Sequence, residues 1–360
     1  MEEFSCKTRL ISGAGTISAL AELGGKRLFL VTDPFFMKNG VAKQVAEASK
    51  CPQVEIFDKV QPDPTVELAA EGTAKLKAFE PDLLVALGGG SAMDAAKAMA
   101  YFAKGSYRLA AIPTTSGSGS EVTDFAILTH NRVKHPLVDP RLRPDVAILD
   151  SDLLQQLPKP LIAEAGFDVL AHAAEAYVAR KAGTISDLYA REAFSSAYAS
   201  LPASYAGNQT VRLKVHMAAT MAGMAFTQAG LGLCHAMSHS LGGIFHVAHG
   251  RLNAILLPAI IGCNAHVAGK KYAELARAAG MGGSAETIAV RNLKNCLIRL
   301  RRELNLPETL VQAGIDPRSL WRNVDEIVKA TLADPCCGTN PMPVEDFLVR
   351  RILEEVTGRV

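Results

Sequence analysis

The first 150 residues of the chain alternate short apolar runs with stretches of helical periodicity. The strand candidates are RLFLVTD (27–33), VEIFDKV (54–60), DLLVALGGGS (82–91), LAAIPTTSGSGSE (109–121) and DVAILD (145–150). Helical patterns cover 67–79 and 92–103. Strands that alternate with helices predict a doubly wound, parallel α/β sheet, because parallel neighbours need a crossover connection. The segment 126–139 breaks this rhythm and is interpreted as a hairpin.

The pattern changes after Asp150. Pro158 and Pro160 punctuate the chain, and long stretches follow with Ala, Leu and Met at helical spacing. A chain of 360 residues is long enough for two domains with separate cores. We therefore predict an α/β + all-α protein, with a dinucleotide-binding α/β domain at 1–155 and an all-helical, metal-binding domain at 156–360.

Composition narrows the range of partners and compartments. The net charge is only +2, which gives no sign of nucleic-acid or membrane binding. Seven scattered cysteines are read as reduced thiols in a cytoplasmic protein. The first ten residues are charged and do not resemble a signal peptide. The most apolar later run, AILLPAIIGC (254–263), is too short to cross a bilayer and is interpreted as a buried helix.

Two loops rich in glycine and hydroxyl groups follow strand candidates. Gly88, Gly89, Gly90 and Ser91 stand where a strand passes into a helix, and residues 114–120 (TTSGSGS) follow the next strand. Glycines there let a backbone approach phosphate, and free amides at a helix start attract anions. A plain strand-to-helix turn explains an isolated GGGS equally well. The two loops together favour a nucleotide crevice, although the GxGxxG fingerprint is absent.

Asp33 ends the first clear strand candidate. A carboxylate in that place binds a ribose hydroxyl pair and repels a 2′-phosphate, which favours NAD over NADP. The equally supported alternative is an Asp that only forms the turn before Pro34.

Four side chains form a candidate metal site, namely Asp168, His172, His235 and His249. Asp168 and His172 are four residues apart, so that a helix places both on one face. Three imidazoles and one carboxylate suit a first-row divalent ion such as Fe²⁺ or Zn²⁺. His239 is four residues after His235 and competes as a ligand. Glu121, Glu164 and Glu175 are candidates for outer contacts, but helix-face or capping roles are more common for such residues.

Four motifs resemble the iron-containing, group III alcohol dehydrogenases. They are GGGSAMDAAK (88–97), IPTTSGSGSEVT (112–123), GFDVLAHAAEAY (166–177) and HAMSHSLGGIFHVAHGRLNAILLP (235–258). Within that family, the opening KTRLISGAG and the closing TNPMP look most similar to the 1-propanol dehydrogenases of propanediol utilisation. The resemblance implies an N-terminal nucleotide domain and a C-terminal helical metal domain.

The resemblance also implies individual roles. It makes Asp168, His172, His235 and His249 the metal ligands and places His239 beside the substrate and nicotinamide as a catalytic residue. It implies that NAD is contacted by Asp33, Gly89, Gly90, Ser91, Asp94, Thr114, Thr115 and Lys134. Arg251 departs from the family pattern and is expected to influence the substrate charge that the site accepts.

These observations predict a metal- and NAD-dependent alcohol dehydrogenase, with Fe²⁺ as the favoured metal and Zn²⁺ as its alternative. The apolar residues between His235 and Ile261 favour a short-chain primary alcohol or aldehyde, such as 1-propanol and propanal. The alternatives are a glycerol or 1,3-propanediol dehydrogenase, a dehydroquinate-synthase-like lyase, or a binding protein that kept the fold. We expect a cytoplasmic homo-oligomer (a dimer), with residence in a bacterial microcompartment as the alternative location.

Overall fold

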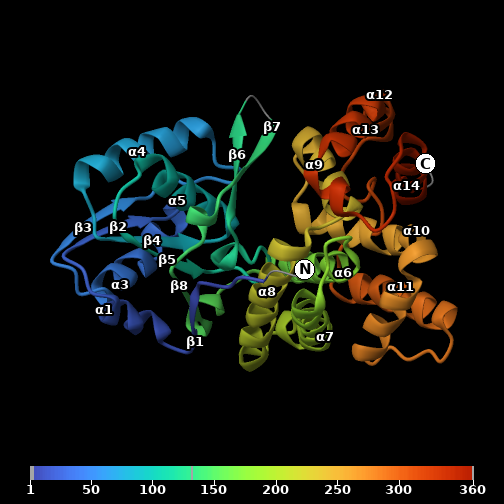
Figure 1. The fold of residues 1–360 in the computed structure, drawn as a ribbon, viewed down its shortest axis with the longest axis horizontal. Helices are drawn as coiled ribbons and strands as arrows, with labels where there is room; N and C mark the ends of the chain where they lie inside the picture. The colour runs from blue at the N-terminus through green and yellow to red at the C-terminus, as the bar shows by residue number, and fades with distance from the viewer. Residues whose placement is uncertain (1–3, 131–132, 359–360) are drawn as a thin grey trace. The chain divides into compact units, whose positions relative to one another are not determined.

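The computed structural model describes residues 4–130 and 133–358 (Figure 1). They divide into two compact units, which are described separately. One contains Cys6–Leu157, and the other contains Pro158 onward together with Phe4 and Ser5. The ring of Phe4 stacks on that of Tyr189, with centroids 5.6 Å apart, which ties this early segment to the helical unit. The sequence analysis divided the chain after residue 155 and gave no sign that Phe4 contacts the helical unit.

The unit Cys6–Leu157 is built on a six-stranded sheet of order β1-β8-β5-β4-β2-β3, in which every pairing is parallel. The strands are β1 (Arg9–Gly13), β2 (Arg27–Val31), β3 (Gln53–Phe57), β4 (Leu83–Gly88), β5 (Arg108–Pro113) and β8 (Val146–Asp150). Its helices are α1 (Leu20–Leu23), α2 (Pro34–Lys38), α3 (Val41–Ala48), α4 (Val66–Phe79) and α5 (Gly90–Ala103). Short 3-10 turns, η1 to η4, lie at Thr16–Ala19, Ser120–Val122, Pro140–Leu142 and Ser151–Leu154.

Both faces of this sheet are buried, which explains the continuous apolar runs of its central strands. On β2, Leu28 and Leu30 face a core shared with α1 and α3, whereas Phe29 and Val31 face a core shared with α4 and α5. Helices on both faces of a parallel sheet make the doubly wound architecture that the alternating pattern predicted. The edge strand β1 was missed, because its residues are mostly exposed and form no apolar run.

The predicted hairpin is present as an antiparallel pair, β6 (Phe125–His130) and β7 (Val133–Val138). A hydrogen bond from the Thr129 amide to the Pro64 carbonyl, 2.8 Å long, joins β6 to the segment that leads into α4. The hairpin therefore stays attached to the nucleotide-loop unit although it lies outside the main sheet.

The second unit is helical, as predicted. Its helices are α6 (Lys159–Val178), α7 (Thr184–Tyr205), α8 (Gln209–Ala229), α9 (Leu233–Phe245), α10 (His249–Ala278), α11 (Glu286–Glu303), α12 (Pro317–Arg322), α13 (Val324–Ala333) and α14 (Asp346–Thr357). A 3-10 turn, η5, spans Pro335–Thr339. Helix α6 packs against α7, α8 and α10, and α10 also packs against α9. The candidate metal ligands lie on α6, α9 and α10, so this packing brings them together.

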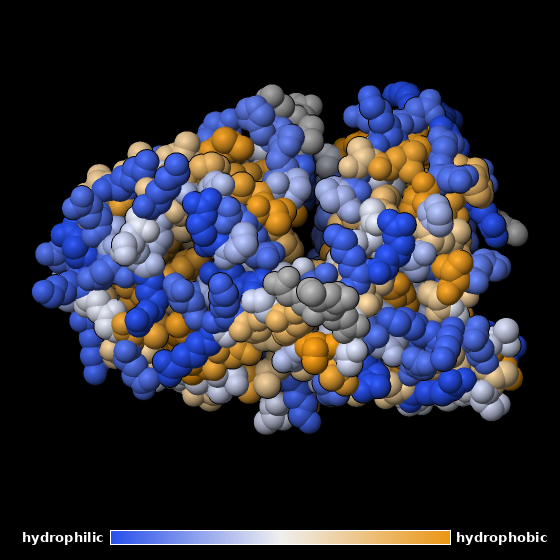
Figure 2. All heavy atoms as spheres, in the orientation of Figure 1, coloured by the Kyte–Doolittle hydropathy of each residue, from blue (hydrophilic) through white to orange (hydrophobic). Residues whose placement is uncertain are grey.

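Helix α10 contains the apolar run 254–263 in its first half and continues through Pro258. Within the described residues it is the one helix long and apolar enough to cross a membrane, but 78% of its apolar window is buried inside the protein. Its hydropathy is thus accounted for by core packing, as the sequence predicted for this run. The face shown in Figure 2 mixes hydrophilic and apolar side chains over both units.

Candidate functional site

Three helices of the second unit bring the predicted metal ligands together. Helix α6 carries Asp168 and His172, the first turn of α9 carries His235, and α10 begins at His249. One ligand atom each of Asp168, His235 and His249 lies within 4.8 Å of the others. Oδ1 of Asp168 is 3.6 Å from Nε2 of both His235 and His249. Residues separated by up to 81 positions in the chain therefore converge on one carboxylate oxygen.

His172 lies at the border of this cluster. Its Nδ1 is 3.8 Å from Oδ1 of Asp168, and its ring stacks on that of His235 with centroids 4.3 Å apart. The His172 ring also stacks on the ring of Phe226, so an apolar side chain borders this imidazole. The compact set of three thus has His172 as its immediate neighbour, and the fourth-ligand role of His172 stays a prediction.

Gly250 explains how His249 reaches the cluster. A Cβ atom at Gly250 would lie 2.1 Å from the carbonyl oxygen of Glu164, which is too close for any side chain. Only glycine lets the start of α10 pack against the backbone of α6. The glycine after His249 is therefore a packing requirement, and it places the imidazole beside Asp168.

The charge states of Asp168 and His249 suit cation binding. Burial would raise the pKa of Asp168, but the imidazoles of His172, His235 and His249 lower it well below its usual range. Burial, reinforced by neighbouring imidazoles, lowers the pKa of His249 well below its usual value, although Asp168 opposes this shift. An ionised carboxylate beside a neutral imidazole is the ligand form that a divalent ion requires.

The donor set passes the test for a transition metal. Imidazole nitrogens with one carboxylate suit iron, zinc or another first-row ion, whereas calcium and magnesium would take more oxygen ligands. The side chains of Asp168 and His235 are largely buried. The side chain of His249 is 28% exposed, so one ligand is accessible from solvent. The residues present therefore fit the metal that the sequence predicted.

Glu175 holds His235 in place. Its Oε2 lies 2.6 Å from Nδ1 of His235, and both side chains are almost completely buried. A carboxylate can only accept, so Nδ1 carries the hydrogen and Nε2 faces Asp168. Burial would lower the pKa of His235, but Asp168 and Glu175 together raise it to about 9. Ligand histidines commonly donate their second nitrogen to a carboxylate in this way.

Glu175 also caps the start of α9. It accepts hydrogen bonds from the backbone amides of Gly232 (3.1 Å) and Cys234 (2.6 Å). Free amides at a helix start attract a negative charge. The capping role that the sequence favoured is therefore present, and the same side chain contacts a predicted ligand. By contrast, Glu164 pairs with Arg251, and Glu121 is buried in η2.

Asn253 is a site residue that the sequence analysis missed. Its Nδ2 donates to Oδ1 of Asp168 (2.8 Å) and lies 3.4 Å from Nε2 of His235. Its Oδ1 accepts from the hydroxyl of Ser238 at 2.5 Å. The available signal was one amide four residues after His249, inside an apolar stretch of α10. Asn253 orients Asp168, because the amide hydrogen fixes the carboxylate oxygen that faces the imidazoles.

His239 is positioned by a second carboxylate. Its Nδ1 lies 2.9 Å from Oδ2 of Asp334, and its ring stacks on His249 with centroids 5.0 Å apart. Burial would raise the pKa of Asp334, but the hydrogen bond with His239 and other contacts lower it overall. His239 is not one of the three residues whose ligand atoms converge, which agrees with a role beside the metal ligands.

The charge of Arg251 is already neutralised. Its Nε donates to Oε1 of Glu164 at 2.9 Å, and its Nη2 contacts the same oxygen. The sequence analysis expected Arg251 to influence which substrate charge is accepted. The structure shows that Arg251 forms an ion pair between α10 and α6, and its influence on substrate charge stays a prediction.

In the other unit, the two predicted nucleotide loops lie side by side. Strands β4 and β5 are parallel neighbours, and the amide of Thr114 donates to the carbonyl of Gly88 at 2.9 Å. A Cβ atom on Gly89 would be 3.3 Å from Oγ1 of Thr115, and one on Gly90 would be 3.3 Å from the Ser118 side chain. Helix α5 begins at Gly90, so its free amides open at this edge.

Asp33 lies at the same edge of the sheet. It is the N-cap of α2, and its Oδ1 accepts from the amides of Phe35 (2.9 Å) and Phe36 (3.2 Å). Its Oδ2 is 3.7 Å from the position of a Cβ on Gly88. The turn role and proximity to the glycine loop therefore coexist, because one oxygen caps the helix while the other faces the loop.

Asp94 and Lys134 complete the predicted cofactor set. Asp94 accepts from the hydroxyl of Ser120 at 3.1 Å. Burial raises the pKa of Asp94 to about 6, against the opposing charges of Lys97 and Lys134. Lys134, on β7, forms an ion pair with Asp63 at 2.7 Å. Ser91 is the second residue of α5, and its predicted cofactor role rests on this position alone.

Lys97 was not identified from the sequence. Its Nζ is within 3.1 Å of four oxygens, those of the Ser120 hydroxyl, the Thr123 carbonyl and hydroxyl, and the Phe125 carbonyl. This buried ammonium ties α5 to the second loop and to β6. The signal available was a Lys in an otherwise apolar helical stretch.

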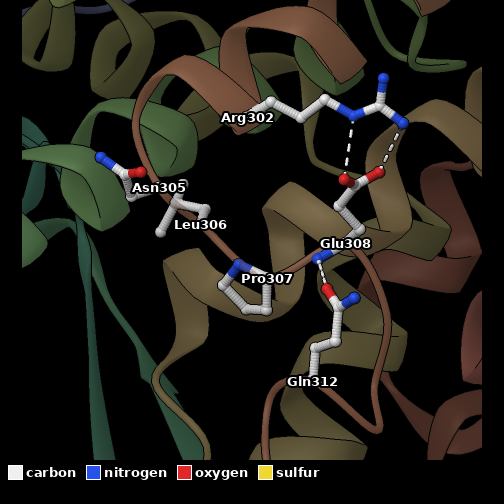
Figure 3. A pocket seen from close by; sticks show the side chains of 6 residues that line it. All are labelled: Arg302, Asn305, Leu306, Pro307, Glu308 and Gln312. Carbon is white, nitrogen blue, oxygen red and sulfur yellow. Dashed lines mark hydrogen bonds and ion pairs between the residues drawn. The ribbon is translucent and has the colours of Figure 1, made fainter.

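Figure 3 shows a surface hollow in the helical unit that contains none of these residues. It is lined by Arg302, Asn305, Leu306, Pro307, Glu308 and Gln312. Arg302 and Glu308 pair across it, with Nε and Nη2 donating at 2.9 and 2.8 Å. Its charged groups already satisfy each other, so the hollow is no rival to the imidazole cluster.

Family models match both units. Residues 7–151 match the model described as iron-containing alcohol dehydrogenase, and 162–357 match the C-terminal model of that family. The chain belongs to the iron-containing alcohol dehydrogenase family. The predicted class, a metal-dependent, NAD-linked oxidoreductase acting on alcohols, is confirmed by this membership.

Two relatives match over almost their whole length. The 1-propanol dehydrogenase PduQ of Salmonella typhimurium is 37% identical, with 99% of this chain and 100% of that protein covered. The NADPH-dependent butanol dehydrogenase of Clostridium saccharobutylicum is 35% identical, with 98% and 97% covered. The resemblance to 1-propanol dehydrogenases, drawn from the two ends of the sequence, is confirmed.

Two solved structures show the same fold. The iron-containing alcohol dehydrogenase of Thermococcus thioreducens has a TM-score of 0.91 and 33% identity, covering 98% of this chain and 99% of that one. The sulfoacetaldehyde reductase of Bifidobacterium kashiwanohense, solved with NAD⁺, has a TM-score of 0.89 and 25% identity, covering 99% of both chains. The predicted fold class is therefore confirmed.

Proposed function

We propose that this enzyme transfers a hydride reversibly between NAD(H) and a short-chain primary alcohol or aldehyde, such as 1-propanol and propanal. The observation that carries the proposal is the convergence of Asp168, His235 and His249 within 4.8 Å. The similarity to a 1-propanol dehydrogenase over the full chain supports the substrate class. A cytoplasmic location and a dimeric state remain part of the proposal.

A divalent ion, with Fe²⁺ preferred, would be held by Asp168, His172, His235 and His249 and would supply the Lewis acidity that polarises a carbonyl or acidifies an alcohol. The chain's own contribution is to keep these ligands in the required state. Asp168 stays ionised, Glu175 directs Nε2 of His235 inward, and Asn253 orients the Asp168 carboxylate.

His239 is proposed to carry the proton of the alcohol. Its Nδ1 is engaged by Asp334, which fixes the tautomer when the ring is neutral. Nε2 is then free to accept a proton, and the Asp334 carboxylate stabilises the imidazolium that results. The stacking of the His239 ring on that of His249 supports this role beside the metal ligands.

NAD is proposed to occupy the edge of the parallel sheet formed by the two loops. Gly89, Gly90 and Ser91 would present backbone amides to the pyrophosphate, and Thr114 and Thr115 would border it. Asp94 and Lys134 are proposed to flank the cofactor, and Asp33 to bind the ribose hydroxyls. The closeness of the loops, where a Cβ atom added at Gly89 would lie 3.3 Å from Oγ1 of Thr115, supports this arrangement.

The structure removes one argument for an apolar substrate. The apolar residues between His235 and Ile261 were expected to line the substrate site. Leu252, Leu256 and Ile260 are instead fully buried in the helical core. Their hydropathy is explained by packing, so the short-alcohol proposal rests on the relatives rather than on this run.

Steady-state kinetics with purified, metal-loaded enzyme tests the proposal. Propanal and butanal reduction with NADH should show a measurable kcat/KM that depends on added Fe²⁺ or Zn²⁺. In the oxidative direction at one pH, 1-propanol should be preferred over glycerol and 1,3-propanediol. A clear preference for glycerol would replace the short alcohol by a polyol and leave the metal ligands unchanged.

A further inference from the structure

Asp334 faces two exchangeable protons besides its capping role. One belongs to Nδ1 of His239, 2.9 Å from Oδ2, and the other to the thiol of Cys336, which hydrogen-bonds to the same carboxylate. The backbone amide of Cys336 also donates to Oδ1 at 2.8 Å. One ligand atom each of His239, Asp334 and Cys336 lies within 4.8 Å of the others.

We propose that His239, Asp334 and Cys336 form a second metal site, which takes a thiolate-binding divalent cation such as Zn²⁺. Nitrogen, oxygen and sulfur ligands at this spacing match the ligand types that zinc accepts in proteins. Three protein ligands leave a fourth tetrahedral position for water or substrate.

Charge balance favours the exchange of a proton for a cation. Binding moves the hydrogen of the neutral imidazole from Nδ1 to Nε2 and releases the thiol hydrogen to solvent, and no electrons are transferred. The thiolate and the Asp334 carboxylate together carry two negative charges, which a divalent cation neutralises. A half-buried pair of anions without a cation would be unstable, so the empty site keeps its protons.

The three ligands are held by short local connections. Asp334 follows the end of α13 and caps η5, which contains Cys336. Thr339, at the end of η5, donates from Oγ1 to the carbonyl of Leu231 at 2.6 Å, and its own carbonyl accepts from the amide of Arg180. The segment before α9 and the turn that carries Cys336 are thus fastened together, and His239 follows on α9.

Sulfur distinguishes this site from the one described above. The predicted ligands Asp168, His172, His235 and His249 offer only nitrogen and oxygen. The nearby thiol of Cys234 contacts Asn253 instead, with Sγ 3.5 Å from Oδ1. Thiolate ligation therefore reports the second site alone.

Occupation of this site has a consequence for activity, which rests on the proposed role of His239. A cation on Nδ1 replaces the hydrogen bond to Asp334 and leaves the ring hydrogen on Nε2, so this nitrogen can no longer accept the proton of the alcohol. Excess Zn²⁺ should then lower kcat, whereas the metal at Asp168 supports it. Zinc would act as an inhibitor at one site and as a functional metal at the other.

Cobalt provides the test, because Co²⁺ bound to a thiolate gives a near-ultraviolet charge-transfer absorption that nitrogen and oxygen ligands do not give. The metal-depleted full-length protein is titrated with Co²⁺ without air. The expected result is a thiolate band that Cys336→Ser abolishes and that His249→Ala retains. Cys337→Ser is the matched control, since the Cys337 thiol instead contacts the carbonyl of Thr331 at 3.0 Å.

Absence of the thiolate band in the wild-type protein would overturn the proposal. So would a band that persists in Cys336→Ser, or one that is lost equally in Cys337→Ser. Far-ultraviolet circular dichroism checks that each variant is folded, and Cys336→Ala replaces Cys336→Ser if the latter is not. The absorption does not depend on turnover, so an inactive enzyme would not obscure this result.

Discussion

Oε2 of Glu175 and Nδ1 of His235 are 2.6 Å apart, and 60 positions in the chain separate the two residues. Each is almost completely buried, with side-chain exposures of 2% and 1%. The contact fixes which nitrogen of His235 faces Asp168. It makes Glu175 a positioning residue for a metal ligand, and this role can be measured without turnover.

Glu175→Gln should weaken metal binding about 10- to 100-fold, because loss of the carboxylate lets the His235 ring change its tautomer. Competition with a chromogenic chelator measures the affinity. Glu192→Gln is the control, since Glu192 is an exposed carboxylate on α7. An affinity equal to that of the wild type would show that the capping of α9 is the whole role of Glu175.

His249→Ala should remove most of the bound metal and activity, because it deletes one of the converging ligands. NADH binding should remain, since the predicted cofactor residues belong to the other unit. His239→Ala should keep the Fe²⁺ held at Asp168 and reduce kcat. Iron content by atomic absorption and NADH fluorescence titration distinguish these cases, and equal iron loss in both variants would make His239 a ligand of the iron at Asp168.

Asp33→Asn should raise NADP-dependent activity relative to NAD-dependent activity. The amide keeps the acceptor that caps α2 but removes the negative charge that would repel a 2′-phosphate. A like-charge contact in a solvated crevice is worth on the order of 1–4 kcal/mol, so we expect about a fivefold or larger change in the ratio of kcat/KM values. Asp139→Asn, at the cap of η3, is the control for lost charge. An unchanged ratio would place Asp33 away from the ribose.

Asp94 should make the protein less stable as pH rises through the weakly acidic range. Its pKa is raised from 3.8 to about 6, so between these values the folded state holds a proton that the unfolded state has released. This stabilisation is complete below about pH 4 and is lost as the pH approaches and passes 6.

Urea denaturation of wild type and Asp94→Asn at pH 4, 5, 6 and 7 isolates this contribution. The free energy of unfolding of the wild type minus that of the variant should decrease from pH 4 to pH 6. The subtraction is needed because other carboxylates, such as Asp139, have lowered pKa values and give the opposite slope. If this difference in the free energy of unfolding does not vary with pH, Asp94 has the same pKa in the folded and the unfolded state.

Local periodicity determined the elements of the fold. The runs that became β2, β4 and β5 are apolar on consecutive residues because both faces of their sheet are buried, so the strands were identifiable from the chain alone. The i, i+4 spacing of Asp168 and His172 likewise depends only on the geometry of one helix. Motif order was sufficient to indicate the family.

The tertiary structure decided what the candidate ligands touch. Asp334 reaches His239 across 95 positions, and Asn253 reaches Asp168 across 85. It also showed that Arg251 is neutralised by Glu164 and that the apolar residues after His249 belong to the core. Such contacts depend on how whole helices pack. The periodicity of one segment does not determine which distant polar group its side chains will contact. The sequence by itself therefore determined the elements and the residue types of the metal centre, and only packing decided the carboxylates and amides that orient them.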